Sequence, residues 1–264
     1  MPSAPTAVRD PRRPYDDLLA IPAQSWAWEF LRRSDRIRDA WAALKPAWEE
    51  REASGIRTVR LDGADSSELT PLLWASSPHQ GAADVSLVWD QHANNRVLQA
   101  VAVPVRFGYG GVILDLEQIG VQKTVVQVNG DQHLLLRDGC RSLQIAIGGA
   151  PITDTVALFV DTGEGASNLQ LSMLGCLRVL RLTGTLDPRY FPPHPRSKRL
   201  LVVLKALDGY LANKNHREIA LELFGAERVE RDWCDPGEHL RDAVRRAIVS
   251  GVALMEHGYR KLLR

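Results

Sequence analysis

The sequence predicts an α+β protein of three regions, because its apolar residues change from helical spacing to short strand-like runs and then back to helical spacing. Residues 1–55 are predicted to form an N-terminal helical module, residues 56–166 a small antiparallel β-sheet or sandwich, and residues 167–264 a helical domain. Hydrophobic residues make up 45% of the 264-residue chain and charged residues 25%, a composition that suits a globular protein with a substantial core.

The N-terminal region carries apolar side chains at helical spacing. We expect Ser25 to cap one helix and Ser34 to cap the next, because serine side chains accept hydrogen bonds from the first free amides of a helix. The helical pattern continues past Pro46, which either kinks the second helix or starts a third one carrying Trp48, and it stops near Gly55.

Aromatic residues are dense in this region, which contains Tyr15, Trp26, Trp28, Trp41 and Trp48. A helical module of this size does not need all of these rings for its own core. Two interpretations stay open: the rings pack against the next region, or they form an interface with a partner or a second subunit.

The middle region consists of short β-branched runs separated by turn residues. Asn129-Gly130 and Asp138-Gly139 lie between such runs and predict tight turns, because these residues tolerate a positive φ. The glycine-rich residues 108–111 are predicted to bend a strand rather than to hold phosphate. The predicted strands cover residues 85–89, 97–107, 111–116, 121–128, 133–136, 143–147 and 156–160.

The C-terminal region returns to helical spacing. A proline-rich connector at residues 187–195 separates its first helix from the others, because prolines exclude helix there. Asp235-Pro236-Gly237 is predicted to break the chain before the last helix. The predicted helices cover residues 169–182, 196–211 and 217–224, a short segment at 226–234, and a long helix from 238 to about 257.

Residues 214–229 have the pattern of a helix-turn-helix. Ile219 supplies a core side chain, the small Ala220 lets another helix cross closely, Gly225 makes the turn, and Val229 anchors the following helix. A helix held at a steep angle to its neighbour can enter the ~12 Å major groove of DNA. An ordinary helix pair joined by a glycine turn is the alternative interpretation.

This pattern departs from an ordinary helix-turn-helix in one respect. The segment where a recognition helix would stand, residues 226–234, is cut short by the break that follows it. Either this short helix or the start of the long helix at Glu238 therefore enters the groove, and the sequence leaves both possibilities open.

Charge is distributed unevenly along the chain. Residues 56–166 carry 7 basic and 12 acidic side chains, net −5, whereas residues 186–264 carry 15 and 11, net +4. A basic end after an acidic middle indicates a region that meets a polyanion. Asp242 stands four residues before Arg246, which also fits a surface ion pair. We predict that the basic residues around the helix-turn-helix bind DNA: Lys214, Arg217, Arg228, Arg231, Arg241, Arg245 and Arg246.

Two stretches resemble known regulators. Residues 26–33 (WAWEFLRR) resemble a short N-terminal module of proteobacterial regulators linked to conjugative elements. The C-terminal motifs are more specific: RYFPPHPR at 189–196, REIA at 217–220, LFG at 223–225, DW at 232–233, LRDAVRR at 240–246 and GYRKLL at 258–263. With them the chain is similar, over roughly residues 12–50 and 120–264, to the FseA/RovC-type transcriptional activators, which carry a variant helix-turn-helix domain.

The resemblance implies a sequence-specific activator of mobile-element transfer or secretion-system genes, because the chain has both the N-terminal module and the C-terminal domain. It also implies a homo-oligomer, with double-stranded promoter DNA and RNA polymerase as partners. The alternative is an antiactivator that sequesters another transcription regulator through the same C-terminal domain. An acidic C-terminal face would favour that role, and here the charge is +4.

No pattern in the sequence indicates an enzyme, a cofactor or a metal. Nucleophile-elbow, phosphate-loop and zinc-protease motifs are absent, and no histidine has a second one three or four residues away. An enzyme using the acidic β-rich region as its pocket is a further alternative. The three cysteines form no C-x-x-C pair, and no apolar run suits a signal peptide or a membrane span, so we expect a cytoplasmic protein.

Overall fold

The structure is a computed structural model that describes residues 15–61, 69–105, 112–113, 116–154, 156–161, 166–234 and 239–264. Contacts divide the chain into two compact units: a β unit, Pro22–Pro192 with Ala253–Arg264, and a helical unit, Met1–Ile21 with Pro193–Val252. The division into three domains stays a prediction. Each of the two compact units contains residues from more than one of the predicted domains. In the described part of the chain no helix is long and apolar enough to span a bilayer.

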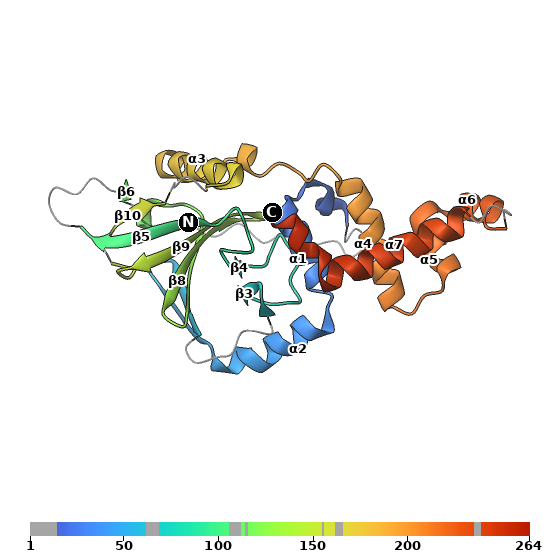
Figure 1. Ribbon diagram of the computed structural model, residues 1–264, viewed down its shortest axis with the longest axis horizontal. Coiled ribbons are helices and arrows are strands. Elements are labelled where there is room, and N and C mark those ends of the chain that lie inside the picture. The colour runs from blue at the N-terminus through green and yellow to red at the C-terminus, as the bar shows by residue number, and fades with distance from the viewer. Residues whose placement is uncertain are drawn as a thin grey trace, which may run out of the picture. The chain divides into compact units, whose positions relative to one another are not determined.

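An eight-stranded sheet forms the centre of the β unit, in the order β1-β2-β7-β8-β9-β5-β10-β6 (Figure 1). The strands β3, Leu72–Ala75, and β4, Leu87–Trp89, pair in a second sheet. The bounds in the large sheet are β1 Glu49–Ala53, β2 Ile56–Leu61, β5 Leu98–Pro104, β6 Val112–Ile113, β7 Gln122–Val128, β8 Asp131–Asp138, β9 Arg141–Gly149 and β10 Val156–Val160.

The α+β class is confirmed, but the prediction of a small antiparallel sheet needs correction. The large sheet is mixed, because β2 pairs parallel with β7 and β5 pairs parallel with β9. Parallel partners are joined by long connections, so the alternation within each strand carries no information about which distant strand lies beside it.

Both predicted turns are confirmed. Asn129 (φ 50°) and Gly130 (φ 92°) connect the antiparallel β7 and β8, and Gly139 (φ 58°) follows Asp138 in the turn to β9. These positive φ values explain why asparagine and glycine stand there. The glycine-rich residues 108–111 lie outside the described residues.

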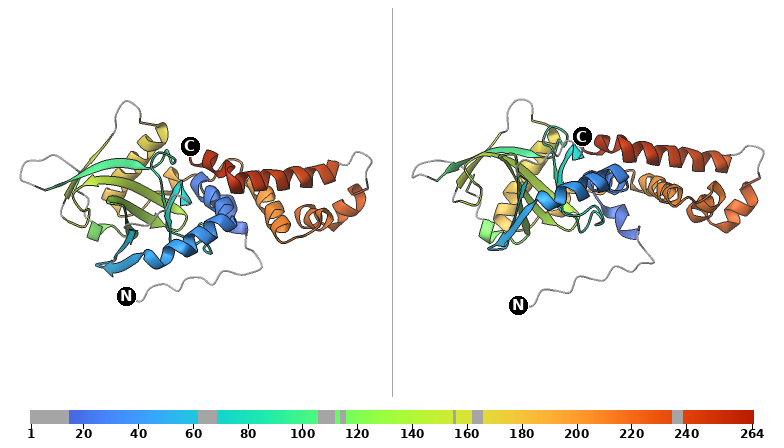
Figure 2. Two further views of the ribbon diagram at one scale, coloured as in Figure 1. Left: turned by 60° about the horizontal axis from the view of Figure 1, so that its bottom comes forward. Right: turned by 90° about the horizontal axis from the view of Figure 1, so that it is seen from below.

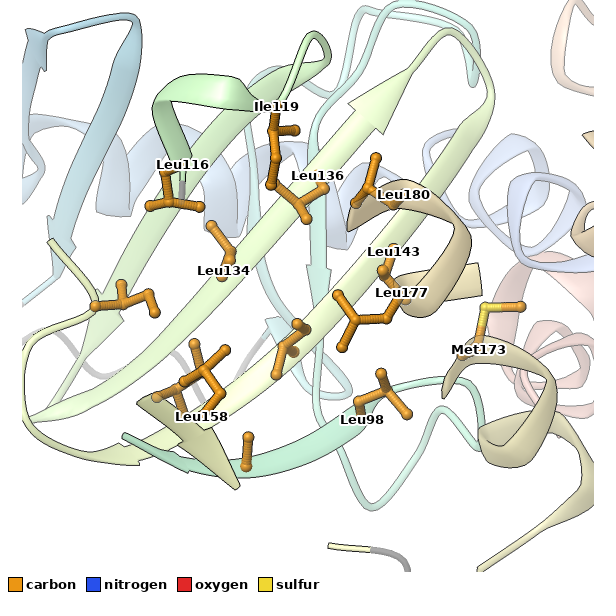
Figure 3. Packing of buried hydrophobic residues seen from close by; sticks show 14 of the residues in the cluster. Leu98, Leu116, Ile119, Leu134, Leu136, Leu143, Leu158, Met173, Leu177 and Leu180 are labelled. Carbon is orange, nitrogen blue, oxygen red and sulfur yellow. The ribbon is translucent and has the colours of Figure 1, made fainter. Parts of the chain in front are cut away.

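The sheet is buried on both faces. In β8, Leu134 and Leu136 belong to the cluster under α3 (Asn168–Thr183), whereas Leu135 between them belongs to the cluster on the opposite face. Figure 3 shows Leu177 and Leu180 of α3 directed toward the leucines of the sheet. Alternation along a strand therefore fills two cores, which accounts for the unbroken apolar run in β8.

Two short helices precede the sheet, α1 (Ala23–Leu31) and α2 (Asp35–Leu44). Ser34 stands at the N-cap position of α2, as predicted, but its side chain accepts no capping hydrogen bond. The prediction for Ser25 is wrong: α1 already begins after Pro22, and the Ser25 hydroxyl donates a hydrogen bond to the carbonyl oxygen of Cys140 at 3.2 Å. With Pro22 at the N-cap position, the helix starts three residues earlier than it would with Ser25 there.

The helix predicted for residues 48–52 is also wrong. A 3-10 turn at Lys45–Ala47 ends the helix, and the charged run Glu49–Ala53 forms the exposed edge strand β1 against β2. Ser54 (φ 52°) and Gly55 (φ 70°) make the turn between them. Pairing with β2 overrides the helical preference of glutamate and arginine in this segment.

The tryptophans of the N-terminal region lie in the chain's own core. Trp26 and Trp28 are fully buried, and the Trp48 ring lies 5.7 Å from Trp41 and 6.0 Å from Trp74. Trp41 is half-buried against the same cluster. Packing against the β-rich region, the first of the two open interpretations, therefore accounts for the tryptophans, whereas Tyr15 lies in the helical unit and donates a hydrogen bond to the Asp208 Oδ2 at 2.7 Å.

The helical unit contains a 3-10 turn at Asp16–Ala20 and the helices α4 Ser197–Leu211, α5 His216–Phe224, α6 Ala226–Asp232 and α7 His239–Glu256, of which the residues after Val252 belong to the β unit. Both views of Figure 2 show α7 running beside α4 and α5. Glycine permits the close approach of α7 to α4: a Cβ on Gly251 would lie 2.8 Å from the Leu207 Cβ.

Candidate nucleic-acid interface

The predicted helix-turn-helix segment folds as two short helices on α4. Ala220 of α5 is fully buried, and Ile219 lies against Gly209 of α4, where a Cβ would stand 2.8 Å from the Ile219 Cγ1. The predicted close crossing is present, and Gly209, which the sequence analysis did not single out, is the residue that permits it.

Gly225 and Val229 have the structural roles expected of them. Gly225 adopts φ +83° between α5 and α6, a conformation that favours glycine, and Val229 is the buried residue of α6. The predicted segment 226–234 is helical only to Asp232. The predicted break at residues 235–237 and the predicted helix start at Glu238 lie outside the described residues.

The start of α5 is held by a capping box. The Asn215 side chain accepts hydrogen bonds from the amides of Arg217 and Glu218, both at 3.0 Å, and the Glu218 carboxylate accepts from the Asn215 amide at 2.7 Å. Arg217 in this first turn is exposed. The capping fixes the backbone below Arg217, so its guanidinium is presented to solvent from a rigid base.

A shallow groove opens on the helical unit between the end of α4, the start of α5 and the residue after α6. One wall is Trp233, whose ring lies 5.5 Å from the Arg241 guanidinium carbon. Two of the seven predicted cations, Lys214 just before α5 and Arg217 in α5, line the groove, and a third, Arg241 of α7, stacks on its wall. The lining residues are Tyr210, Asn213, Lys214, Asn215, His216, Arg217 and Trp233.

Five of the predicted cations have partners on the same unit. Lys214 pairs with Glu222, and Arg241, besides stacking on Trp233, has a further interaction. Asp232 is the shared partner of Arg228 and Arg231, at 3.7 and 2.8 Å, and Asp242 pairs with Arg245 at 3.3 Å. Within the described residues Arg217 and Arg246 pair with no carboxylate.

The expected pair of Asp242 with Arg246 is therefore wrong, because Asp242 contacts Arg245 three residues on instead. Both spacings place side chains on the same side of a helix, so the sequence alone does not choose between them. The consequence for the interface is that Arg246 stands exposed on α7.

Asp232 at the end of α6 pairs with two of the predicted cations, although its sequence position did not single it out. The hydrogen bond from Arg231 lowers the pKa of Asp232 and raises the pKa of Arg231, so both groups are charged at neutral pH. In the sequence, Asp232 could have been found because it stands four residues after Arg228, a spacing at which helical side chains form ion pairs. Because the two arginines are exposed, water screens the pairs, and the outer side of each guanidinium stays accessible to a ligand.

Titratable groups elsewhere are explained by packing. Burial lowers the pKa of His133 and raises that of the Cys176 thiol to about 11, so both groups are neutral at pH 7. Cys234 and His239 are exposed. In the described ranges no three histidine, cysteine, aspartate or glutamate side chains gather as metal ligands would.

The comparison with protein families now bears on this surface. Residues 170–264 match the family model described as the type VI secretion (T6SS) transcription factor RovC, DNA-binding domain. The matched segment begins in α3 and contains the whole groove together with all seven predicted cations. No curated protein matches the chain.

Proposed function

We propose that this chain, which carries a DNA-binding domain of the RovC type at residues 170–264, is a sequence-specific transcriptional activator of mobile-element transfer or secretion-system genes. One observation carries the proposal. Lys214 and Arg217 line one groove, and Arg241 stacks on its Trp233 wall, in the segment that matches a DNA-binding domain. Such a surface suits the phosphate backbone, because neutralising phosphates releases condensed counterions.

The cations divide into two roles by position. Lys214 and Arg217 line the groove at the capped start of α5, where a side chain reaches backbone phosphates. Arg228 and Arg231 project from α6, which contributes Val229 to the core and is otherwise exposed. We assign base reading to this short helix, because a helix that packs against the protein through one side chain leaves its other sides open to the major groove.

Activation requires contact with RNA polymerase as well as DNA. In a purified transcription assay we expect the protein to raise initiation at a promoter that carries its binding site. The antiactivator alternative predicts instead that the protein binds another regulator and lowers transcription. The net charge of +4 over residues 186–264 favours DNA over a basic protein partner.

We further propose that the protein acts in the cytoplasm as a homo-oligomer, because reading two half-sites requires symmetry. Since Trp26, Trp28 and Trp48 are buried, we do not assign them to the subunit interface. Light scattering of the full chain tests the assembly, and a mass of 29.3 kDa at working concentration would contradict it.

The experiment that tests DNA binding is a salt titration with the full chain and genomic promoter fragments. Each phosphate contact lowers the log–log slope of affinity against salt by about 0.9, so several contacts give a steep dependence. A flat dependence, or no binding to any fragment, would remove DNA from the proposed function. Recovery of bound genomic fragments then identifies the operator.

A further inference from the structure

The contact between Arg231 and Asp232 has a geometry that the ion pairs of Lys214, Arg228 and Arg245 lack. The Arg231 Nε donates to the Asp232 Oδ1 at 2.8 Å, and the Arg231 Nη2 donates to the Oδ2 of the same carboxylate at 3.4 Å. The carboxylate thus lies side-on to the guanidinium and fixes the plane of the group. A single contact would leave that plane free to turn.

The side-on contact decides which donors remain. Guanidinium has five N–H groups in a rigid fork, and the carboxylate engages one on Nε and one on Nη2. The remaining edge presents one N–H from each terminal nitrogen, side by side and parallel. That edge matches the O6 and N7 acceptors that guanine displays in the major groove.

Arg228 and Arg245 provide the comparison within the same surface. The closest approach of Arg228 to Asp232 is 3.7 Å, and that of Arg245 to Asp242 is 3.3 Å. The Arg231 side chain is 65% exposed although its inner edge is bound, so its outer edge is open to a ligand. Arg231 is therefore both oriented and accessible.

We propose that Asp232 is a positioning residue that holds Arg231 for a bidentate contact with one guanine of the operator. This proposal rests on the proposed function, and it adds which arginine reads a base and which base it reads. Asp232 itself touches no base. Its effect is to present the guanidinium edge in one plane before DNA arrives, which favours guanine over bases that lack the paired acceptors.

The variants that test this are Asp232→Asn, Arg231→Ala and Glu230→Gln. Asp232→Asn keeps the shape of the side chain but removes the carboxylate. Glu230 is exposed on the same helix, so Glu230→Gln removes one negative charge near DNA without touching the Arg231 pair. It is the matched control for the general gain in affinity that follows when a carboxylate is lost.

Each full-length variant is first used to select duplexes from a random-sequence pool. We expect the wild type and Glu230→Gln to enrich one motif, and Asp232→Asn and Arg231→Ala to lose a guanine at one and the same position of it. Asp232→Asn should still recover as much DNA in total as Glu230→Gln does, because both remove one negative charge.

The second measurement uses a duplex of the selected motif in which 7-deazaguanine replaces that guanine and so removes the N7 acceptor. Wild-type affinity should fall by about 5- to 150-fold, the range of one bidentate contact, whereas both variants should bind the two duplexes equally. The double variant Arg231→Ala/Asp232→Asn should discriminate between the two duplexes to the same extent as Arg231→Ala alone, since Asp232 acts only through Arg231.

The outcomes separate this proposal from the proposed function. Asp232→Asn enriching the unchanged wild-type motif overturns the proposal and leaves DNA binding intact. So does a wild type that is indifferent to 7-deazaguanine at every guanine of its motif. A wild type that recovers no duplex contradicts the proposed function itself. Circular dichroism of each variant establishes that it is folded.

Discussion

Glu29 in the β unit and Asp232 in the helical unit each hold two arginines, yet they do so in different surroundings. The Glu29 side chain is 2% exposed, with Arg32 at 2.7 Å and Arg33 at 3.0 Å. The Asp232 side chain is 34% exposed and its arginines are more exposed still. A carboxylate with two arginines is thus part of the core in one unit and part of a solvated surface in the other.

The two carboxylates differ in the partners that are available to the charged groups around them. Glu29 also accepts a hydrogen bond from the buried Ala82 amide at 2.8 Å, so removing it leaves donors without partners inside the protein. The arginines at Asp232 are held by contacts that water screens, and their open edges can take up a phosphate or a base. Glu29 and its arginines therefore stabilise the fold, whereas the arginines at Asp232 are accessible to a ligand. Four substitutions test this difference.

The largest expected effect is in the core of the sheet. Leu134 is fully buried beneath α3, so Leu134→Ala should lower the free energy of unfolding by about 2–5 kcal/mol through the cavity it leaves. Urea unfolding measures this. The control is Leu182→Ala in α3. Leu182 is 78% exposed, so this substitution should change the free energy of unfolding by less than about 0.5 kcal/mol.

Glu29→Gln comes next, with an expected loss of about 2–3 kcal/mol, since Arg32 and Arg33 reach some solvent and recover part of the penalty. Burial alone would raise the pKa of Glu29, but Arg32, Arg33 and the Ala82 amide together lower it. A lowered pKa in the folded state means that the carboxylate stabilises the fold above its unfolded pKa.

The pH dependence of Glu29 follows from that sign. Its stabilisation should be complete at neutral pH and should disappear as the pH falls through the folded pKa. Wild-type stability should therefore decline in acid more steeply than that of Glu29→Gln, and the two curves should converge at low pH. Parallel curves would show that Glu29 does not titrate as its surroundings require.

Gly251→Ala should cost about 1–2 kcal/mol. Alanine improves helix propensity by up to ~1 kcal/mol, but its Cβ would stand 2.8 Å from the Leu207 Cβ and 3.1 Å from the Val203 carbonyl oxygen. Overpacking of about 1–3 kcal/mol against atoms close to the backbone outweighs the gain. Val249→Ala, at a site 63% exposed, is the control for α7, and a stabilised Gly251→Ala would disprove the close crossing.

The smallest effect on stability, below about 0.5 kcal/mol, is expected for the exposed Arg217, but its effect on DNA binding should be clear. Arg217→Ala should weaken binding to all duplexes alike and should reduce the salt slope by about 0.9, as the loss of one phosphate contact does. Titrations with operator and scrambled DNA measure both quantities. A selective loss for operator would move Arg217 to the base-reading group.

Local sequence patterns predicted most of the described elements. Strand-length β-branched runs marked six of the strands well, and Asn129-Gly130 marked a turn because few residues tolerate its positive φ. The patterns were misleading at residues 49–53, where glutamate and arginine favour helix but pairing with β2 decides. The strands Ile56–Leu61 and Leu72–Ala75 were not predicted.

The sequence by itself also indicated where a polyanion would bind, since charge, the turn glycine and the buried Val229 are local properties. Only the tertiary structure decided which of those charges act together. Asp232 was not selected because the side-on plane of its contact with Arg231 is a matter of two side-chain conformations. Likewise the parallel pairing of β5 with β9 depends on segments that meet only in space, and no periodicity within either strand records it.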